Sequence, residues 1–181
     1  LSLPKMAEHF LEDLAKQCGA TAALGLIAED NVFVAAKNEG GRQLGVAMRV
    51  GQRFPLTYGC HGKAIAAFLP EAELETLLKG KQLCFQGDPK RFNKVKLMMD
   101  LERCRRDWFA EDREETAPGL NGVASPVLGP GGTPIGYVVV LGFSSGEAAH
   151  RSGPLVAEAG KALSRQLGAK VEAESNGRQE P

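Results

Sequence analysis

A glycine-rich turn at residues 129–132 limits the folds open to this sequence more than any other feature. The turn reads GPGG and separates two apolar segments, 120–128 and 133–143. Glycine and proline in this combination are typical of a tight turn, so the two segments are predicted to form a β-hairpin. Residues 138–141 read VVVL, and such a continuous apolar run is typical of a central strand buried on both faces. Helices elsewhere in the chain must therefore cover this sheet.

The N-terminal third predicts one helix followed by more strands. Apolar residues recur at helical spacing from Leu3 to Cys18, with Ser2 as the candidate N-cap and Gly19 as the C-terminal stop. Segments 21–28 and 32–38 flank a polar turn and predict a second hairpin. A third strand is predicted over 44–50, because apolar side chains alternate there with a period of two.

The remaining segments predict four further helices. Helical character runs over 61–69, is broken by Pro70, and resumes over 71–79. Asn93 is the candidate cap of a helix that extends toward Trp108, and Ser152 is the candidate cap of a last helix that reaches 167. The order of elements indicates an α+β fold with one antiparallel sheet, and it does not alternate regularly enough for a Rossmann fold.

Composition excludes several classes of function. Twenty-two basic residues balance 22 acidic ones, so no overall field attracts nucleic acid or an anionic membrane. The longest apolar run, 135–143, is much shorter than the roughly 20 residues that cross a bilayer. The four cysteines have no zinc-site spacing, and neither a dinucleotide nor a P-loop motif occurs. We expect a cytoplasmic protein with no cofactor and no metal.

Two motifs, in order, resemble the signature stretches of IclR-type (isocitrate lyase regulator) effector-binding domains. Residues 50–70 read VGQRFPLTYGCHGKAIAAFLP, and residues 108–127 read WFAEDREETAPGLNGVASPV. The first resembles the family's apolar-Pro pair, small-residue turn, Gly-Lys-Ala and apolar helix. The second resembles its aromatic residue, acidic pair, glycine and strand with an Ala-x-Pro ending. The likeness extends from Leu3 to about Ala169.

This resemblance implies a GAF-like sheet of about six antiparallel strands flanked by helices. It implies an effector-binding domain over 1–170, followed by a polar tail over 171–181 that we expect to be disordered. The family's winged helix-turn-helix normally lies N-terminal to such a domain and is absent from this sequence, which begins with Leu and is expected to be part of a longer protein. DNA would be bound only through that missing domain. The implied partners are a small organic acid effector and other copies of the chain, in a dimer or tetramer.

The resemblance also implies a set of ligand-binding residues. They are Phe54, Cys60, His61, Asp112, Leu120, Gly122, Val139 and Leu141. In relatives that bind two- and three-carbon keto acids, hydroxyl side chains stand where this chain has Val139 and Leu141. We therefore predict a ligand with one carboxylate, held near Cys60 and His61 at a small-residue helix start, and an apolar or aromatic body against the strand.

Several residues allow a second interpretation. His61 could pair with the ligand when protonated, or could simply shape the turn through a hydrogen bond. Cys60 could be an activated thiol, although a small packing thiol is the simpler interpretation. The acidic residues of segment 111–115 could bind a metal or act as an acid/base pair, but a solvated loop with only Asp112 turned inward, by analogy with the family, is favoured.

Two other features also have a simpler explanation. The basic excess over 79–106 could contact DNA, but it fits the polar face of a helix, and Trp108 is expected to anchor a helix end. The rival functions are a GAF-like thiol-dependent reductase and a protein-interaction module without a ligand.

Overall fold

The computed structural model describes residues 2–41 and 46–172. Its core is a six-stranded antiparallel sheet with the strand order β3-β2-β1-β6-β5-β4. The strands are β1 (Thr21–Ala28), β2 (Asn31–Asn38), β3 (Arg53–Pro55), β4 (Ala110–Arg113), β5 (Asn121–Leu128) and β6 (Pro134–Leu141). Both predicted hairpins are present, because β1 pairs with β2 and β5 pairs with β6. The predicted α+β class with about six strands is confirmed.

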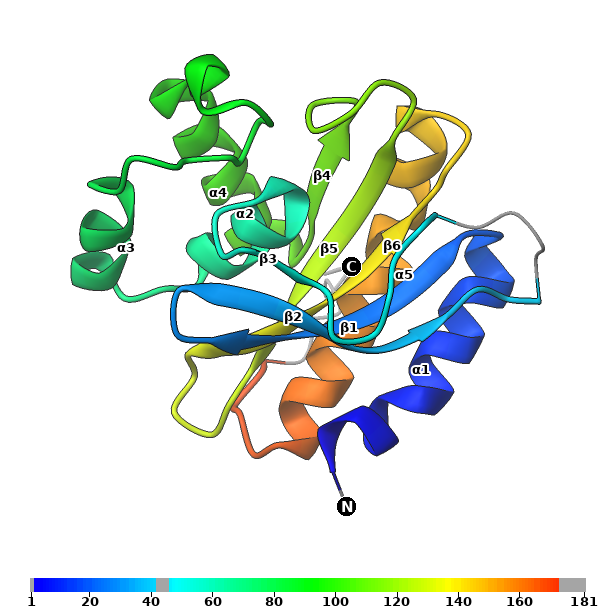
Figure 1. Cartoon of the computed structure of the whole chain (residues 1–181). Helices are drawn as coiled ribbons and strands as arrows, with labels where there is room; N and C mark the ends of the chain where they lie inside the picture. The colour runs from blue at the N-terminus through cyan, green and yellow to red at the C-terminus, as the bar shows by residue number, and fades with distance from the viewer. Residues whose placement is uncertain (1, 42–45, 173–181) are drawn as a thin grey trace, which may run out of the picture.

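Helices cover both faces of the sheet (Figure 1). They are α1 (Leu3–Cys18), α2 (Gly59–Ala67), α3 (Glu71–Leu78), α4 (Lys94–Asp107) and α5 (Gly146–Gln166), with a short 3-10 helix, η1, at Pro89–Arg91. Helices α1 and α5 pack on one face, and α2 and α4 lie on the other. Strand β6 serves both cores: Val138 and Val140 belong to the first, whereas Tyr137 and Val139 belong to the second. This alternation is the period of two that a strand imposes on its side chains.

The residues that cap the N-termini of helices were predicted correctly at two of three sites. The Ser2 side chain accepts a hydrogen bond from the Lys5 N–H, and the Asn93 side chain accepts one from the Lys96 N–H. The prediction that Ser152 caps the last helix is wrong, because Ser145 caps α5 and Ser152 lies inside it. Pro154 also lies inside this helix, which packs along β5.

The third strand lies after the position predicted for it. Residues 44 and 45 of that prediction fall outside the described residues, and residues 46–50 form no strand. The chain pairs with β2 only from Gly51 onward, where the Gly51 N–H donates to the Val34 carbonyl. Before that point, Lys37 Nζ donates to the Met48 carbonyl at 2.7 Å. The alternating apolar side chains over 46–50 therefore belong to a loop near the sheet and not to a strand paired by backbone hydrogen bonds.

Two further expectations concern the ends and the surface. The polar tail predicted over 171–181 lies outside the described residues from 173 onward. Over 2–41 and 46–172, none of the helices has the length and apolar character needed to cross a bilayer.

Candidate ligand-binding cavity

The start of α2 is pressed against the loop that precedes it. The helix begins at Gly59, two residues earlier than predicted, and all nine of its residues are buried. A Cβ atom added to Gly62 would lie 2.5 Å from the Thr57 carbonyl carbon, so only glycine permits this approach. The Gly59 N–H donates to the Cys84 carbonyl, which ties the helix start to the loop after α3. The first turn of α2 is thereby held over the β5–β6 side of the sheet.

A cavity of about 190 Å³ lies between this turn and the sheet. Seven of the eight residues predicted for the site line it: Phe54, Cys60, His61, Asp112, Leu120, Val139 and Leu141. Gly122 does not line the cavity. It lies directly behind it, because the position of a Cβ on Gly122 is taken by the Leu141 side chain and approaches Cys60 Sγ to 3.5 Å. The structure therefore brings residues from β3, α2, β4, the residue before β5, and β6 to one place.

Eight further residues line the cavity and were not predicted. They are Val46, Ala47, Met48, Gln52, Tyr58, Gly59, Thr116 and Tyr137. Tyr137 could have been found, since it precedes Val139 by two positions on the same strand and must share its face. Residues 46–48 had been assigned to a strand, and no sequence signal places that loop over the cavity. Thr116 lines the cavity beside Asp112, to which its hydroxyl donates a hydrogen bond.

Aromatic rings form one wall of the cavity. The His61 ring stacks on Tyr137 with a centroid distance of 4.6 Å and an interplanar angle of 12°. Phe54 stacks on Tyr58 at 5.6 Å and lies 5.9 Å from the His61 ring. Gly25 stands opposite Tyr137 on β1 and leaves room for the tyrosine ring, which occupies the place of a side chain there. The cavity is thus suited to a flat or apolar group.

Burial keeps the His61 side chain neutral near physiological pH. Burial lowers its pKa from 6.5 to about 4, and the hydrogen bond to the Pro55 carbonyl only partly opposes this. Because a carbonyl can only accept, Nε2 carries the proton in that 3.4 Å contact, and Nδ1 is left as an acceptor. This geometry agrees with the hydrogen-bonded interpretation of His61.

The lowered pKa of His61 predicts a specific dependence of stability on pH. Between pH 4 and 6.5 the unfolded chain binds a proton at His61 that the folded chain does not bind, so the free energy of unfolding falls as the pH decreases through this window. Above pH 6.5 His61 is neutral in both the folded and the unfolded chain, so it no longer lowers the free energy of unfolding. We expect this one group to contribute about 3 kcal/mol across the window.

Urea unfolding at pH 4.5, 5.5 and 7 would measure this effect in the wild type and in His61→Phe, which keeps a ring against Tyr137. Acidic residues also titrate at low pH, so the difference between the two proteins is the quantity of interest. Parallel pH profiles for the two would show that His61 does not titrate as described.

Cys60 is a buried thiol whose pKa lies well above its ordinary value. Burial raises its pKa, and the Asp112 carboxylate raises it further, which outweighs the opposing influence of Lys63. Burial also raises the pKa of Cys104, to about 12. All four cysteines are free. Because a thiolate is the nucleophile in reductase chemistry, these values favour the packing interpretation of Cys60.

Asp112 organises the loop after β4. Its Oδ1 accepts hydrogen bonds from the N–H groups of Glu115 at 2.9 Å and Thr116 at 3.3 Å, and its Oδ2 accepts one from the Thr116 hydroxyl. A Cβ atom added to Gly59 would lie 3.5 Å from Oδ2, so this carboxylate faces the first residue of α2. It therefore provides negative charge at the positive end of that helix.

The inward orientation predicted for Asp112 is confirmed, but the rest of the acidic segment is only in part the solvated loop that was predicted. Residues 110–113 form β4 at the edge of the sheet, paired with β5, and Asp112 is buried there. Glu115 is also largely buried, because it pairs with Lys63 at 2.7 Å. Over residues 2–41 and 46–172, no three His, Cys, Asp or Glu side chains are grouped so that they could hold a metal ion. Trp108 ends α4 in a left-handed conformation and contacts Phe68, with ring centroids 4.7 Å apart.

A sheet of this topology, with a small lined cavity between one face and a helix, defines a GAF-like ligand-binding domain. Residues 1–166 match the family model described as bacterial transcriptional regulator IclR C-terminal. The chain therefore belongs to the IclR family, as an effector-binding C-terminal domain.

Comparisons with individual proteins agree with this assignment. The chain is 31% identical to the HTH-type transcriptional regulator XynR of Escherichia coli over 70% of its own length, and 32% identical to the glycerol operon regulatory protein of Streptomyces griseus over 87%. It spans 50% of the first relative and 63% of the second. Both are regulators of transcription and not enzymes.

Solved structures show the same fold. The Thermotoga maritima IclR structure superposes with a TM-score of 0.78 at 26% identity, covering 93% of this chain and 69% of that one. The C-terminal domain of Escherichia coli KdgR superposes with a TM-score of 0.74 at 23% identity, covering 93% of this chain and 99% of that domain.

Proposed function

We propose that this domain senses a small organic acid with a single-ring aromatic or compact apolar body, bound in the cavity beside His61. Binding would shift a dimer or tetramer of a longer cytoplasmic regulator between arrangements, and thereby change DNA binding by a domain outside residues 1–181. The observation that carries the proposal is the position of seven family-site residues around one cavity whose wall is aromatic and aliphatic.

The size of the cavity supports a ligand with one ring. An apolar cavity of about 150 Å³ is large enough to bind benzene. The present cavity, at about 190 Å³, leaves room for one small polar substituent beyond a ring. Val139 and Leu141 contribute no hydrogen-bond donors to the wall, so a two- or three-carbon keto acid would lose its solvation there without replacement.

The charges around the cavity indicate that His61 is the side chain that would pair with an acidic ligand. His61 is the one basic side chain among the described residues that line the cavity, and Asp112 already contributes a negative charge. A bound carboxylate would stabilise the imidazolium form, so binding an acid should take up a proton. The backbone N–H groups of Cys60 and His61, at the start of α2, would add to the attraction.

Thermal unfolding with benzoate, benzamide and glyoxylate at pH 6 and pH 8 tests the proposal. We expect benzoate at 100 times its Kd to raise the Tm by about 5–10 °C. The benefit of benzoate over benzamide should be larger at pH 6 than at pH 8, because only the carboxylate gains from protonation of His61.

His61→Phe is the matched control, since it keeps the ring and removes the charge. It should bind benzoate no better than benzamide at either pH. Stabilisation by glyoxylate alone would contradict the proposal. Equal stabilisation by benzamide and benzoate would instead indicate a neutral ligand that donates to Asp112, and the absence of any shift would favour an interaction module without a ligand.

A further inference from the structure

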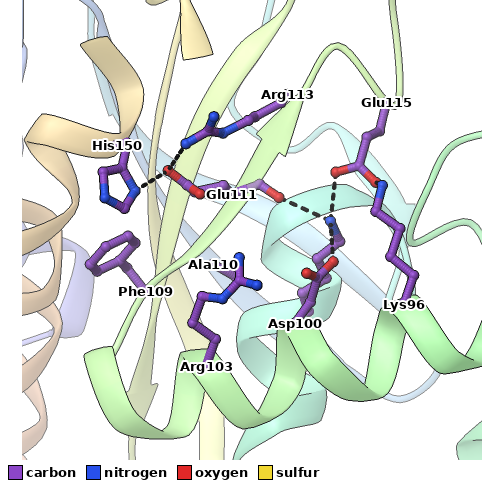
Figure 2. Close-up of a pocket in the computed structure, with 10 residues that line it drawn as sticks. Lys96, Asp100, Arg103, Phe109, Ala110, Glu111, Arg113, Glu115 and His150 are labelled. Carbon is purple, nitrogen blue, oxygen red and sulfur yellow. Dashed lines mark hydrogen bonds and ion pairs between the residues drawn. The ribbon is translucent and has the colours of Figure 1, made fainter. Parts of the chain in front are cut away.

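Lys63 is a buried cation at the centre of an ion-pair network outside the cavity. Its exposed fraction is only 1%. Its Nζ donates to Glu115 Oε1 at 2.7 Å and to the Glu111 carbonyl at 3.0 Å, and it lies 3.2 Å from Asp100 Oδ2. Figure 2 shows Asp100, Glu111 and Glu115 arranged around one point, with these contacts dashed. All three donor positions of the ammonium group are therefore used.

These partners belong to elements that bound the ligand cavity or stand directly behind it. Lys63 follows Cys60 by almost one turn on α2, so the cation is a neighbour of a residue that lines the cavity, although Lys63 does not line it. Glu111 precedes Asp112 on β4, and Glu115 precedes Thr116. Asp100 adds α4, which packs outside α2. A single side chain thus joins the helix, the edge strand and the loop that surround Asp112.

Glu115 is anchored from several directions. Besides Lys63, its carboxylate accepts a hydrogen bond from Lys96 at 3.1 Å, and its carbonyl accepts one from Arg91 at 3.1 Å. Burial would raise the pKa of Glu115, but Lys63 and Lys96 lower it overall. Burial would similarly lower the pKa of Lys63, yet Glu115 and Asp100 raise it overall. Both groups are charged near neutral pH, as a restraint by ion pairing requires.

We propose that Lys63 is a positioning residue for the ligand cavity, which clamps residues 113–120 so that Thr116 and Leu120 close its wall. Lys63 does not itself line the cavity, and its effect on a ligand is indirect. The clamp needs a charged donor and not only a side chain of the right volume, because it must satisfy two carboxylates and a carbonyl. Its effect on ligand affinity rests on the function proposed above, whereas its effect on the loop does not.

A second cavity, beside Lys63, allows the effect of its charge to be tested separately from the effect of its shape. This cavity, about 320 Å³, is lined by Lys63 together with Lys96, Asp100, Arg103, Glu111 and Glu115, among others (Figure 2). It provides space for the larger guanidinium group of an arginine at position 63, which can donate to the same carboxylates. Lys63→Arg should therefore keep the clamp. Lys63→Met keeps the length of the side chain but should lose the clamp, because it has no charge and no hydrogen-bond donor.

Amide hydrogen exchange of the ligand-free protein, followed by mass spectrometry, tests the clamp directly. In Lys63→Met we expect peptides covering 113–120 to exchange about tenfold faster than in the wild type, with β1 and β6 unchanged. In Lys63→Arg they should exchange at close to the wild-type rate. Val156→Ala is the matched control for general destabilisation, because Val156 is buried in the core on the opposite face of the sheet.

The proposal is overturned if Lys63→Met accelerates 113–120 no more than Val156→Ala does, or if Lys63→Arg behaves like Lys63→Met. Should Lys63→Met fail to fold, Glu115→Gln removes the charge on the loop side and carries the same expectation and the same contrary result. Calorimetric titration with benzoate provides the second arm, in which Lys63→Met should bind about tenfold more weakly than Val156→Ala. If the wild type does not bind benzoate, the proposed ligand is wrong, and the exchange experiment still decides the role of Lys63.

Discussion

Replacing Gly62 with Ala is expected to lower the free energy of unfolding by at least about 2 kcal/mol, although alanine normally favours a helix over glycine by about 1 kcal/mol. The added methyl group would meet the Thr57 carbonyl carbon at 2.5 Å and the Leu56 carbonyl oxygen at 3.0 Å. Both are backbone atoms of the loop that leads into α2, so no side chain can rotate away to relieve the contact. Urea unfolding monitored by circular dichroism would measure the loss.

Gly131→Ala is the control for this substitution. Gly131 lies in the β5–β6 turn, and a Cβ atom added there meets nothing within 4 Å. That change should alter the free energy of unfolding by no more than about 0.5 kcal/mol. If Gly62→Ala proves equally harmless, then α2 can move away from the preceding loop at little cost, and the cavity that its first turn closes would be less well defined than described here.

Replacing Val139 with Phe is expected to weaken benzoate binding by about 100-fold or more, equivalent to about 2.7 kcal/mol, while the protein stays folded. Val139 lines the cavity, so the larger ring would occupy the space assigned to the ligand. Filling an existing cavity replaces empty volume with packing contacts and does not force the surrounding chain apart. Calorimetric titration gives the affinity, and thermal unfolding without ligand shows whether the fold is retained.

Val138→Phe is the matched control, one residue away on the same strand. Its side chain points into the core on the other face of the sheet, where it is fully buried and lines no cavity described here. The same change there should destabilise the protein by about 1–3 kcal/mol through overpacking. Benzoate binding that survives Val139→Phe would place the ligand elsewhere, and equal destabilisation by the two variants would mean that no usable space lies beside Val139.

Much of the sheet could be predicted from local patterns. The GPGG turn, the period of two along β6 and the side chains that cap α1 and α4 each depend on residues close together in the sequence. Strand geometry alone places Val139 and Leu141 on one face, two residues apart. The motifs at 50–70 and 108–127 then indicated which residues gather near that face through their resemblance to a family.

Local patterns gave wrong predictions where the structure of a segment depends on contacts with residues far away in the sequence. The alternation over 44–50 looks like a strand, but the partner strand is reached only at Gly51. Ser152 looks like the cap of a helix, but the residue that caps α5 is Ser145, seven positions earlier. Glu115 looks like one of several solvated acids, yet it is held by a lysine 52 positions before it.

What the residues alone determined is the type of wall the cavity has: apolar side chains on one face of β6 and a small-residue start to α2. Tertiary packing decided the chemistry inside that wall. Burial against Tyr137 makes His61 neutral, and the network around Lys63 closes the loop that carries Thr116. Both effects depend on charges and rings that are far apart in the sequence and are removed from water together, and no local pattern encodes that desolvation.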